Sequence, residues 1–250
     1  MKCIICGMER NKDDMHKPYN HTGYVCRWCT TNKDYFTKNT KRSGKKTKSG
    51  FTYGFEFECK PINKRATATM MVDKFVPTRD CSLNHGMTEL KSPIFYSKVG
   101  LKQKFEKASK LLKFDSQCCG QHIHIGNAKY NSQIKYWICC NYGKLFKPLS
   151  NHIGSHKGYC EKIFGRAQNH CARLINDYTN PYDKYNFINV NHNKTIEFRL
   201  AKFVTAEQYY NLVKMCEKIM KTLIDGYNKG KSPDKVGDKI LKIYLSQDEK

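Results

Sequence analysis

Three segments of the chain alternate ionisable side chains with large apolar ones. They are Tyr53-Gly54-Phe55-Glu56-Phe57-Glu58-Cys59, Gly120-Gln121-His122-Ile123-His124-Ile125-Gly126 and Thr195-Ile196-Glu197-Phe198-Arg199-Leu200. Because side chains alternate between the two faces of a sheet, each segment predicts a strand with one apolar and one ionisable face. An ordinary solvated face would carry Lys, Thr, Ser and Gln, whereas these faces gather Glu, Glu, His, His, Glu and Arg.

This choice of side chains predicts a bound cation. Carboxylates on a concave sheet repel one another unless a divalent cation or an arginine neutralises them, and hard oxygen ligands are what Mg²⁺ requires. The chain has only 22 Asp and Glu, so their concentration on these strands is notable. We therefore predict a functional face that binds a divalent cation; a solvated face of an antiparallel sheet is the alternative.

Two C-x2-C pairs lie within the first thirty residues. Cys3 and Cys6 form the first pair, and Cys26 and Cys29 form the second. Each pair can place two thiolates on one turn, and two such turns facing each other complete a tetrahedral Zn²⁺ site. So short a segment buries too little apolar surface to fold alone, so a structural zinc ion would supply the missing stability. Two chance pairs in a chain with 13 cysteines are the alternative.

Composition divides the chain into three parts. Residues 1–36 are predicted to form a zinc-ribbon-like module, residues 37–50 a basic flexible linker, and residues 51–250 a larger domain that contains the three alternating segments. The linker has six basic residues, two glycines and no acid, which is typical of a solvated tether. Contact with the phosphate backbone of RNA or DNA is the alternative role for it.

The charge balance indicates the kind of partner. Lys and Arg number 45 against 22 Asp and Glu, and the net charge of +23 favours nucleic acid, a nucleotide or an anionic surface. No apolar run approaches the roughly 18 residues of a membrane span, so no membrane partner is expected. Adjacent cysteines such as Cys118-Cys119 and the absence of a signal-peptide pattern favour a reduced, cytoplasmic protein.

The periodicity of the remaining residues predicts a mixture of strands and helices. Strands are expected at 51–59, 87–91, 120–126 and 194–200, and helices at 98–114, 131–145, 158–178, 205–227 and 233–245. In the last helix, Pro233 suits the first helical position and Ser232 the N-cap.

Four motifs in this order resemble those of a known family. They are Gly54-Phe55-Glu56-Phe57-Glu58, Thr88-Glu89-Leu90-Lys91-Ser92-Pro93, Cys119-Gly120-Gln121-His122-Ile123-His124 and Thr195-Ile196-Glu197-Phe198-Arg199-Leu200. Over residues 51–225 the chain resembles the amidoligase family, which belongs to the carboxylate–amine ligase superfamily of glutamine synthetase and glutamate–cysteine ligase. That family is found in bacteria, phages and fungi, so a phage-encoded member would work in the cytoplasm of a bacterial host.

The resemblance implies an α+β fold of the glutamine-synthetase-like type. Its antiparallel sheet curves into a partial barrel flanked by helices, and its concave face binds ATP with Mg²⁺ or Mn²⁺. The implied reaction transfers the γ-phosphoryl group of ATP to a carboxylate substrate, and an amine substrate then displaces phosphate from the acyl phosphate to leave an amide. One of the two substrates can be carried on a protein or peptide.

The resemblance also implies roles for individual residues. The candidate catalytic residues are Glu56, Glu58, Glu89, His122, His124, Glu197 and Arg199. Their four carboxylates are the candidate Mg²⁺ ligands. The two histidines would bind metal or donate hydrogen bonds to phosphate or carboxylate oxygens, and the arginine would hold a phosphate or carboxylate with its planar guanidinium.

Four further residues are candidates for binding substrate or nucleotide. They are Asp80, Ser82, Tyr185 and Asn189. The first two fit an acidic turn of the family, and ordinary turn capping is the equal alternative. The chain departs from the family pattern at Lys184, where an arginine is usual, and at Phe203-Val204, where Gly-Thr is usual.

Two other functions compete with the ligase. The cysteine pairs, the linker and the charge would also suit a zinc-containing nucleic-acid-binding protein without ligase activity, of which a nuclease-associated protein is one form. A third interpretation combines the two functions: the basic zinc module recruits a nucleic acid or an acidic protein to the ligase.

A cupin-type oxygenase also uses a His-x-His pair, but it needs a nearby Glu and a later His. Residues 127–131 contain no acid, so this sequence does not favour such an enzyme. No G-x4-G-K-[ST] loop occurs, so ATP binding depends on the resemblance and the carboxylate face.

Overall fold

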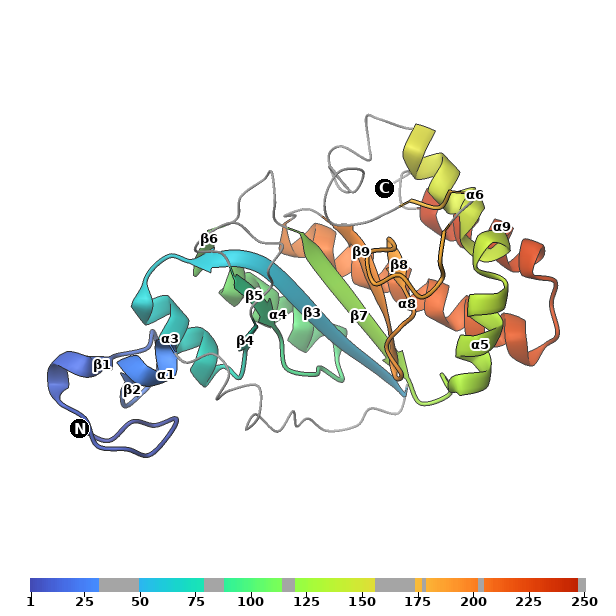
Figure 1. The fold of residues 1–250 in the computed structure, drawn as a ribbon. Helices are drawn as coiled ribbons and strands as arrows, with labels where there is room; N and C mark the ends of the chain where they lie inside the picture. Colours follow the sequence, from blue (N-terminus) through green and yellow to red (C-terminus); the bar gives the residue numbers. More distant parts are fainter. Residues whose placement is uncertain are drawn as a thin grey trace.

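The computed structural model describes residues 1–31, 50–78, 88–113, 120–155, 174–176, 179–201 and 205–246. Over these ranges the chain has an α+β fold with seven α-helices and antiparallel sheets (Figure 1). The predicted α+β class and the predicted antiparallel sheet are confirmed. Nearly all of the predicted linker 37–50 and of the predicted helix 158–178 lies outside the described residues.

A seven-stranded antiparallel sheet forms the centre of the molecule. Its order is β4-β5-β3-β7-β9-β8, with β6 paired to the end of β3, so β4 and β8 are the outermost of the described strands. The strands are β3 (Phe51–Pro61), β4 (Val76–Thr78), β5 (Thr88–Lys91), β6 (Leu112–Lys113), β7 (Gln121–Asn127), β8 (Ile188–Asn189) and β9 (Thr195–Ala201). All four predicted strands are confirmed within about two residues. The strands β4, β6 and β8 were missed because two or three residues are too few to show a period.

The apolar face of the sheet packs on helices α4 (Lys98–Ser109) and α8 (Ala206–Asn228), which lie behind it in Figure 1. Phe55 and Phe57 of β3 contact Phe105 of α4, with ring centroids 5.9 and 5.1 Å apart. Phe105 in turn stacks on Tyr209 of α8 at 4.1 Å. Burying each phenylalanine contributes about 1.5–3 kcal/mol to folding. The core therefore fixes which face of each strand remains for the ionisable side chains.

The remaining helices agree with the predictions only in part. They are α1 (Arg27–Thr31), α3 (Lys64–Val72), α5 (Ser132–Cys140), α6 (Tyr142–Ser155) and α9 (Pro233–Leu245). The single helix predicted at 131–145 is two helices, because the chain breaks at Asn141, whose side chain donates to Trp137 O over 2.9 Å. Helix α9 has the predicted bounds, with Ser232 as its N-cap residue and Pro233 in its first turn, as predicted. The Ser232 hydroxyl makes no capping hydrogen bond to the helix backbone and contacts Asp234 at 3.4 Å.

The N-terminal segment packs against α3, at one end of the molecule in Figure 1. It contains the short helix η1 (Lys12–Asp14), the strands β1 (Met15–His16) and β2 (Val25–Cys26), and α1. The backbone N–H of Tyr19 donates to Thr69 Oγ1 over 2.7 Å, and the Arg65 guanidinium lies 4.1 Å from the centre of the Tyr19 ring. Ala68 and Met71 of α3 are buried together with the cysteines of this segment. No helix in the described ranges combines the length and apolar character needed to cross a membrane.

Candidate functional site

The register of the sheet brings the ionisable faces of four strands together. Glu56 of β3 pairs with His122 of β7, and His124 of β7 pairs with Glu197 of β9. On the other side of β3, Glu58 pairs with Glu89 of β5. These side chains share the face opposite the aromatic core, so the three segments identified in the sequence point their ionisable groups toward one centre.

His122 lies at the middle of this centre and is 1% exposed. Its Nδ1 is 3.1 Å from Glu197 Oε1 and 3.6 Å from Glu56 Oε2. Among the described residues neither ring nitrogen has a partner in hydrogen-bond geometry. One ligand atom from each of His122, Glu56 and Glu197 lies within 4.8 Å of the others, so the three could hold one cation. Burial opposes charge on the ring, but Glu197 and Glu56 raise the pKa of His122 to about 10.

A second group forms around the other oxygen of Glu197. His192, in the bend between β8 and β9, has its Nε2 2.9 Å from Glu197 Oε2. Its ring lies edge-on to that of His124, with centroids 5.1 Å apart. His124, His192 and Glu197 also offer ligand atoms within 4.8 Å of one another. No sequence pattern predicted a role for His192, because a single histidine in a loop has no periodic signal.

Glu197 is held in place by two neighbours. Arg199 Nε donates to Oε1 over 2.8 Å, and Asn189 Nδ2 donates to Oε2 over 2.7 Å. Burial alone would raise the pKa of Glu197, but His122 and His192 hold it well below its usual range. The carboxylate is therefore ionised and fixed in orientation, as a metal ligand must be.

Glu89 and Glu58 belong to neither of the two possible metal-binding groups on the sheet among the described residues. The Lys91 ammonium lies 3.2 Å from Glu89 Oε2 and 2.9 Å from Glu56 Oε1, and Thr78 donates to Glu89 Oε2 over 2.7 Å. Burial and the Glu56 charge raise the pKa of Glu89. Glu58 Oε2 accepts a hydrogen bond from the backbone N–H of Gly120 over 2.6 Å. Of the four predicted Mg²⁺ carboxylates, Glu56 and Glu197 are thus the two that belong to possible metal-binding groups in the described part of the chain.

The predicted substrate residues are placed unevenly. Asn189 lies in the site, as the partner of Glu197. The Tyr185 ring lies 4.7 Å from Lys184 Nζ and 5.8 Å from the Arg199 guanidinium carbon, so Lys184 stands beside the site at the position where the family has an arginine. Asp80, Ser82 and Phe203-Val204 lie outside the described residues.

A pocket of about 810 Å³ adjoins the centre. Glu56, Lys91, His124 and His192 line it on the side of the metal-binding groups, and it extends past Tyr96 and Lys194. Its volume falls within the usual range for small-molecule sites. The pocket thus joins cationic, acidic and aromatic surfaces in one space large enough for a nucleotide.

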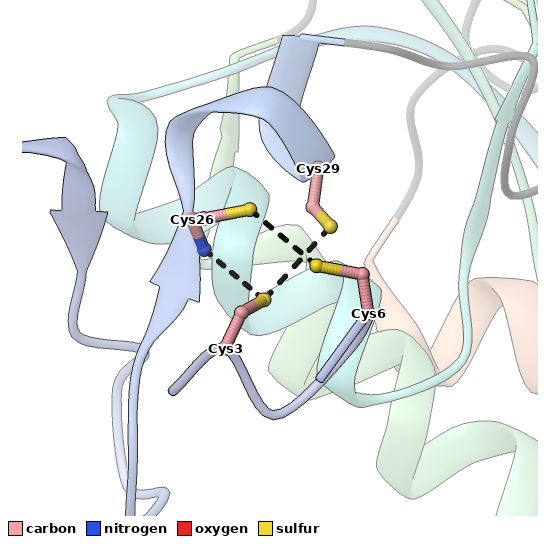
Figure 2. A group of neighbouring side chains, drawn as sticks. All are labelled: Cys3, Cys6, Cys26 and Cys29. Atoms are coloured by element: carbon pink, nitrogen blue, oxygen red, sulfur yellow. Dashed lines mark hydrogen bonds between the residues drawn. The ribbon is translucent and has the colours of Figure 1, made fainter. Parts of the chain in front are cut away.

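The four N-terminal cysteines form a separate cluster, in which their sulfur atoms face one another (Figure 2). Sγ of Cys3 lies 3.9 Å from Sγ of Cys29, and Sγ of Cys6 lies 3.8 Å from Sγ of Cys26. Four sulfurs at 2.3 Å from one tetrahedral ion would be about 3.8 Å apart, so the cluster is compatible with structural zinc.

Electrostatics in this cluster also fit a cation. The backbone N–H groups of Ile5 and Cys26 donate to Cys3 Sγ over 3.4 and 3.3 Å. Burial opposes ionisation of Cys3, but hydrogen bonds from the backbone of Cys6, Cys26 and Ile5 lower its pKa to about 7. Burial and the neighbouring sulfurs raise the pKa of Cys29. Ionisation of all four thiols would therefore need a neighbouring positive charge.

Comparison with known proteins identifies no relative. No protein-family model matches the sequence, and neither the curated proteins nor the solved structures contain a significant match. The function is accordingly argued from the site itself.

Proposed function

We propose that this protein is an ATP-dependent carboxylate–amine ligase that forms an amide through an acyl phosphate. The observation that carries the proposal is the convergence of Glu56, His122, Glu197 and Arg199 beside a pocket of about 810 Å³. A purely structural polar cluster would not need a nucleotide-sized space next to it. The order of the four sequence motifs supports the same class of reaction.

The residues fit a divalent cation. Glu56 and Glu197 supply carboxylate oxygens, and the buried His122 Nδ1 lacks a hydrogen-bond partner among the described residues. When bound, Mg²⁺ and ATP would supply charge neutralisation and the phosphoryl group that activates the substrate carboxylate. Arg199 and Lys91 are fixed cations next to this position and can orient anionic oxygens of the substrates.

A direct test measures Mg²⁺-dependent ATP hydrolysis in the presence of mixed carboxylates and amines. Glu56→Gln and Glu197→Gln should each lower turnover at least about a hundredfold, because each removes fixed charge from the centre. Glu106→Gln is the matched control, since Glu106 is exposed on α4. Undiminished turnover in both site variants would refute the proposed metal centre.

We also propose that Cys3, Cys6, Cys26 and Cys29 bind one structural Zn²⁺. Metal analysis of the purified protein should find about one equivalent. The double variant Cys3→Ser, Cys6→Ser should lose it, whereas Cys140→Ser, which changes an exposed cysteine of α5, should retain it. Equal zinc content in all three proteins would contradict the assignment.

The net charge of +23 favours a second candidate, a zinc-containing nucleic-acid-binding protein. Two measurements, nucleic-acid affinity as a function of salt and ATP turnover, distinguish the two functions. A steep fall of nucleic-acid affinity with salt, together with no ATP turnover, would favour the binding protein. Turnover that increases when nucleic acid or an acidic protein is added would favour a ligase whose target is recruited by the basic module.

A further inference from the structure

We propose that His124, His192 and Glu197 form a second cation site, which selects a divalent transition-metal ion over Mg²⁺. The site goes beyond the ligase proposal and does not depend on it. It uses His192, which none of the sequence motifs includes, and it lies on the pocket side of the buried His122.

The spacing of the three side chains matches that of ligands on one ion. His192 Nε2 and Glu197 Oε2 are 2.9 Å apart, and the third ligand atom, from His124, lies within 4.8 Å of both. Ligands bound at about 2.0–2.2 Å are separated by roughly 3 Å, so small side-chain movements complete the set. His124 Nε2 has no hydrogen-bond partner among the described residues, although Glu56 Oε1 is 3.2 Å away.

The two oxygens of Glu197 can serve two cations at once. A carboxylate has about four lone-pair positions. Glu197 Oε1 accepts a hydrogen bond from Arg199, and its second lone pair faces His122. Glu197 Oε2 accepts a hydrogen bond from Asn189, and its second lone pair faces His192. Glu197 therefore offers Oε1 to the buried group and Oε2 to the site proposed here, so that it can bridge them.

The donor set decides which metal is preferred. Two imidazoles and one carboxylate suit Zn²⁺, Fe²⁺ and Co²⁺, whereas Mg²⁺ prefers a ligand set in which oxygen atoms predominate, as in the group of Glu56, His122 and Glu197. His124 and His192 both line the pocket, so a molecule bound there can reach the ion. Three protein ligands leave a coordination position open, which is the arrangement of a reactive rather than a structural metal site.

Cobalt is a suitable probe because its visible spectrum reports its ligands. Co²⁺ is titrated into the protein with its cysteine cluster already loaded with zinc. We expect weak d–d absorption without thiolate charge-transfer bands, and no displacement by a tenfold excess of Mg²⁺. His192→Gln should weaken Co²⁺ binding at least tenfold. The imidazole is 42% exposed, so this change does not disturb the core. His152→Gln, in α6, is the control and should bind as the unaltered protein does.

Co²⁺ affinity equal in His192→Gln, His124→Gln and the unaltered protein would overturn the site. Absorption from thiolate ligands alone, or complete displacement by equimolar Mg²⁺, would do the same. Failure of the ligase proposal gives a different result: Co²⁺ binding that depends on His192, without any ATP turnover. Turnover with Mg²⁺ but no Co²⁺ binding would retain the ligase and exclude the second site.

Discussion

Lys91 of β5 and Glu56 of β3 are register partners, and the Lys91 ammonium lies 2.9 Å from Glu56 Oε1. The same ammonium is 3.2 Å from Glu89 Oε2. Burial alone would lower the pKa of Lys91, but these two carboxylates raise it, so the lysine stays charged. One ammonium group thus lies between two neighbouring carboxylates and offsets part of their mutual repulsion.

Replacing Lys91 should make the site depend on added cations. Lys91→Met leaves Glu56 and Glu89 facing each other, and we expect the free energy of unfolding to fall by about 2 kcal/mol without divalent ions. Added Mg²⁺ should recover part of this loss, because an ion that binds only the folded state stabilises it. Urea unfolding with and without Mg²⁺ measures both effects. Lys91→Arg keeps the positive charge and should lower the free energy of unfolding less than Lys91→Met does. Equal stability of the unaltered protein and both variants would contradict the role of Lys91 between the two carboxylates.

Asp73 should stabilise the contact between α3 and α4 in a pH-dependent way. Its carboxylate lies 2.7 Å from Lys104 Nζ and 2.8 Å from Lys107 Nζ. Burial would raise its pKa, but the two lysines lower it below the ordinary 3.8. Because the folded-state pKa is the lower one, the stabilisation is present above pH 3.8 and disappears as the pH falls through the folded-state value.

Asp73→Asn should therefore cost about 2 kcal/mol at pH 7, and the difference from the unaltered protein should shrink below about pH 4. Chemical unfolding across this pH range measures the difference. Asp238→Asn changes an exposed residue of α9 and should have little effect. A cost at pH 7 that persists unchanged at pH 3 would show that the ion pairs are not its source.

Removing the Zn²⁺ proposed for the cysteine cluster should loosen α3. Ala68 and Met71 of this helix are buried against Cys3, Cys26 and Cys29, so the cluster and the helix share one small core. After chelation, amide hydrogen exchange should accelerate at least tenfold in Lys64–Val72, while α9 (Pro233–Leu245) should keep its protection. Unchanged protection of α3 in protein shown to have lost its metal would mean that the segment packs without help from the ion.

Two glycines in the strands of the site should respond differently to alanine. A Cβ on Gly126 would lie 2.3 Å from Thr52 Oγ1 and 3.0 Å from the backbone oxygen of Lys194, so Gly126→Ala should cost about 2 kcal/mol. A Cβ on Gly54 would meet His124 and Ser92 at ordinary distances of 3.6 and 3.7 Å. Gly54→Ala should keep the stability within about 0.5 kcal/mol.

Gly54 also lines the pocket, so its substitution should affect ligand binding. The added methyl group narrows the pocket beside Glu56, and we expect the KM for ATP to rise several-fold with kcat nearly unchanged. Steady-state kinetics of the Gly54→Ala protein measures this. A fall in stability as large as that of Gly126→Ala, with KM unaffected, would contradict the proposed use of this pocket.

Much of the fold could be predicted because its signals are local. Period-two alternation fixed the course of β3, β7 and β9, and helical spacing predicted α8 and α9 within one residue. By contrast, α3 was missed because Lys64–Val72 contains two threonines and few large apolar residues, and its stability comes from packing on the N-terminal segment. Helix α4 ended earlier than predicted because residues 112–113 pair with β3, a contact that is distant in the sequence.

The sequence alone determined which side chains share a face of each strand and which cysteines come in pairs, since both depend only on spacing between near neighbours. The sequence did not determine which strands are adjacent in the sheet. Strand pairing decides which ionisable side chains meet at the centre and therefore its chemistry. Tertiary structure placed Lys91 between Glu56 and Glu89, and it brought His192 to Glu197 from a loop without any motif. The physical reason is that strand pairing is governed by burial of the common core, so the contacts between polar side chains follow from packing on the opposite face.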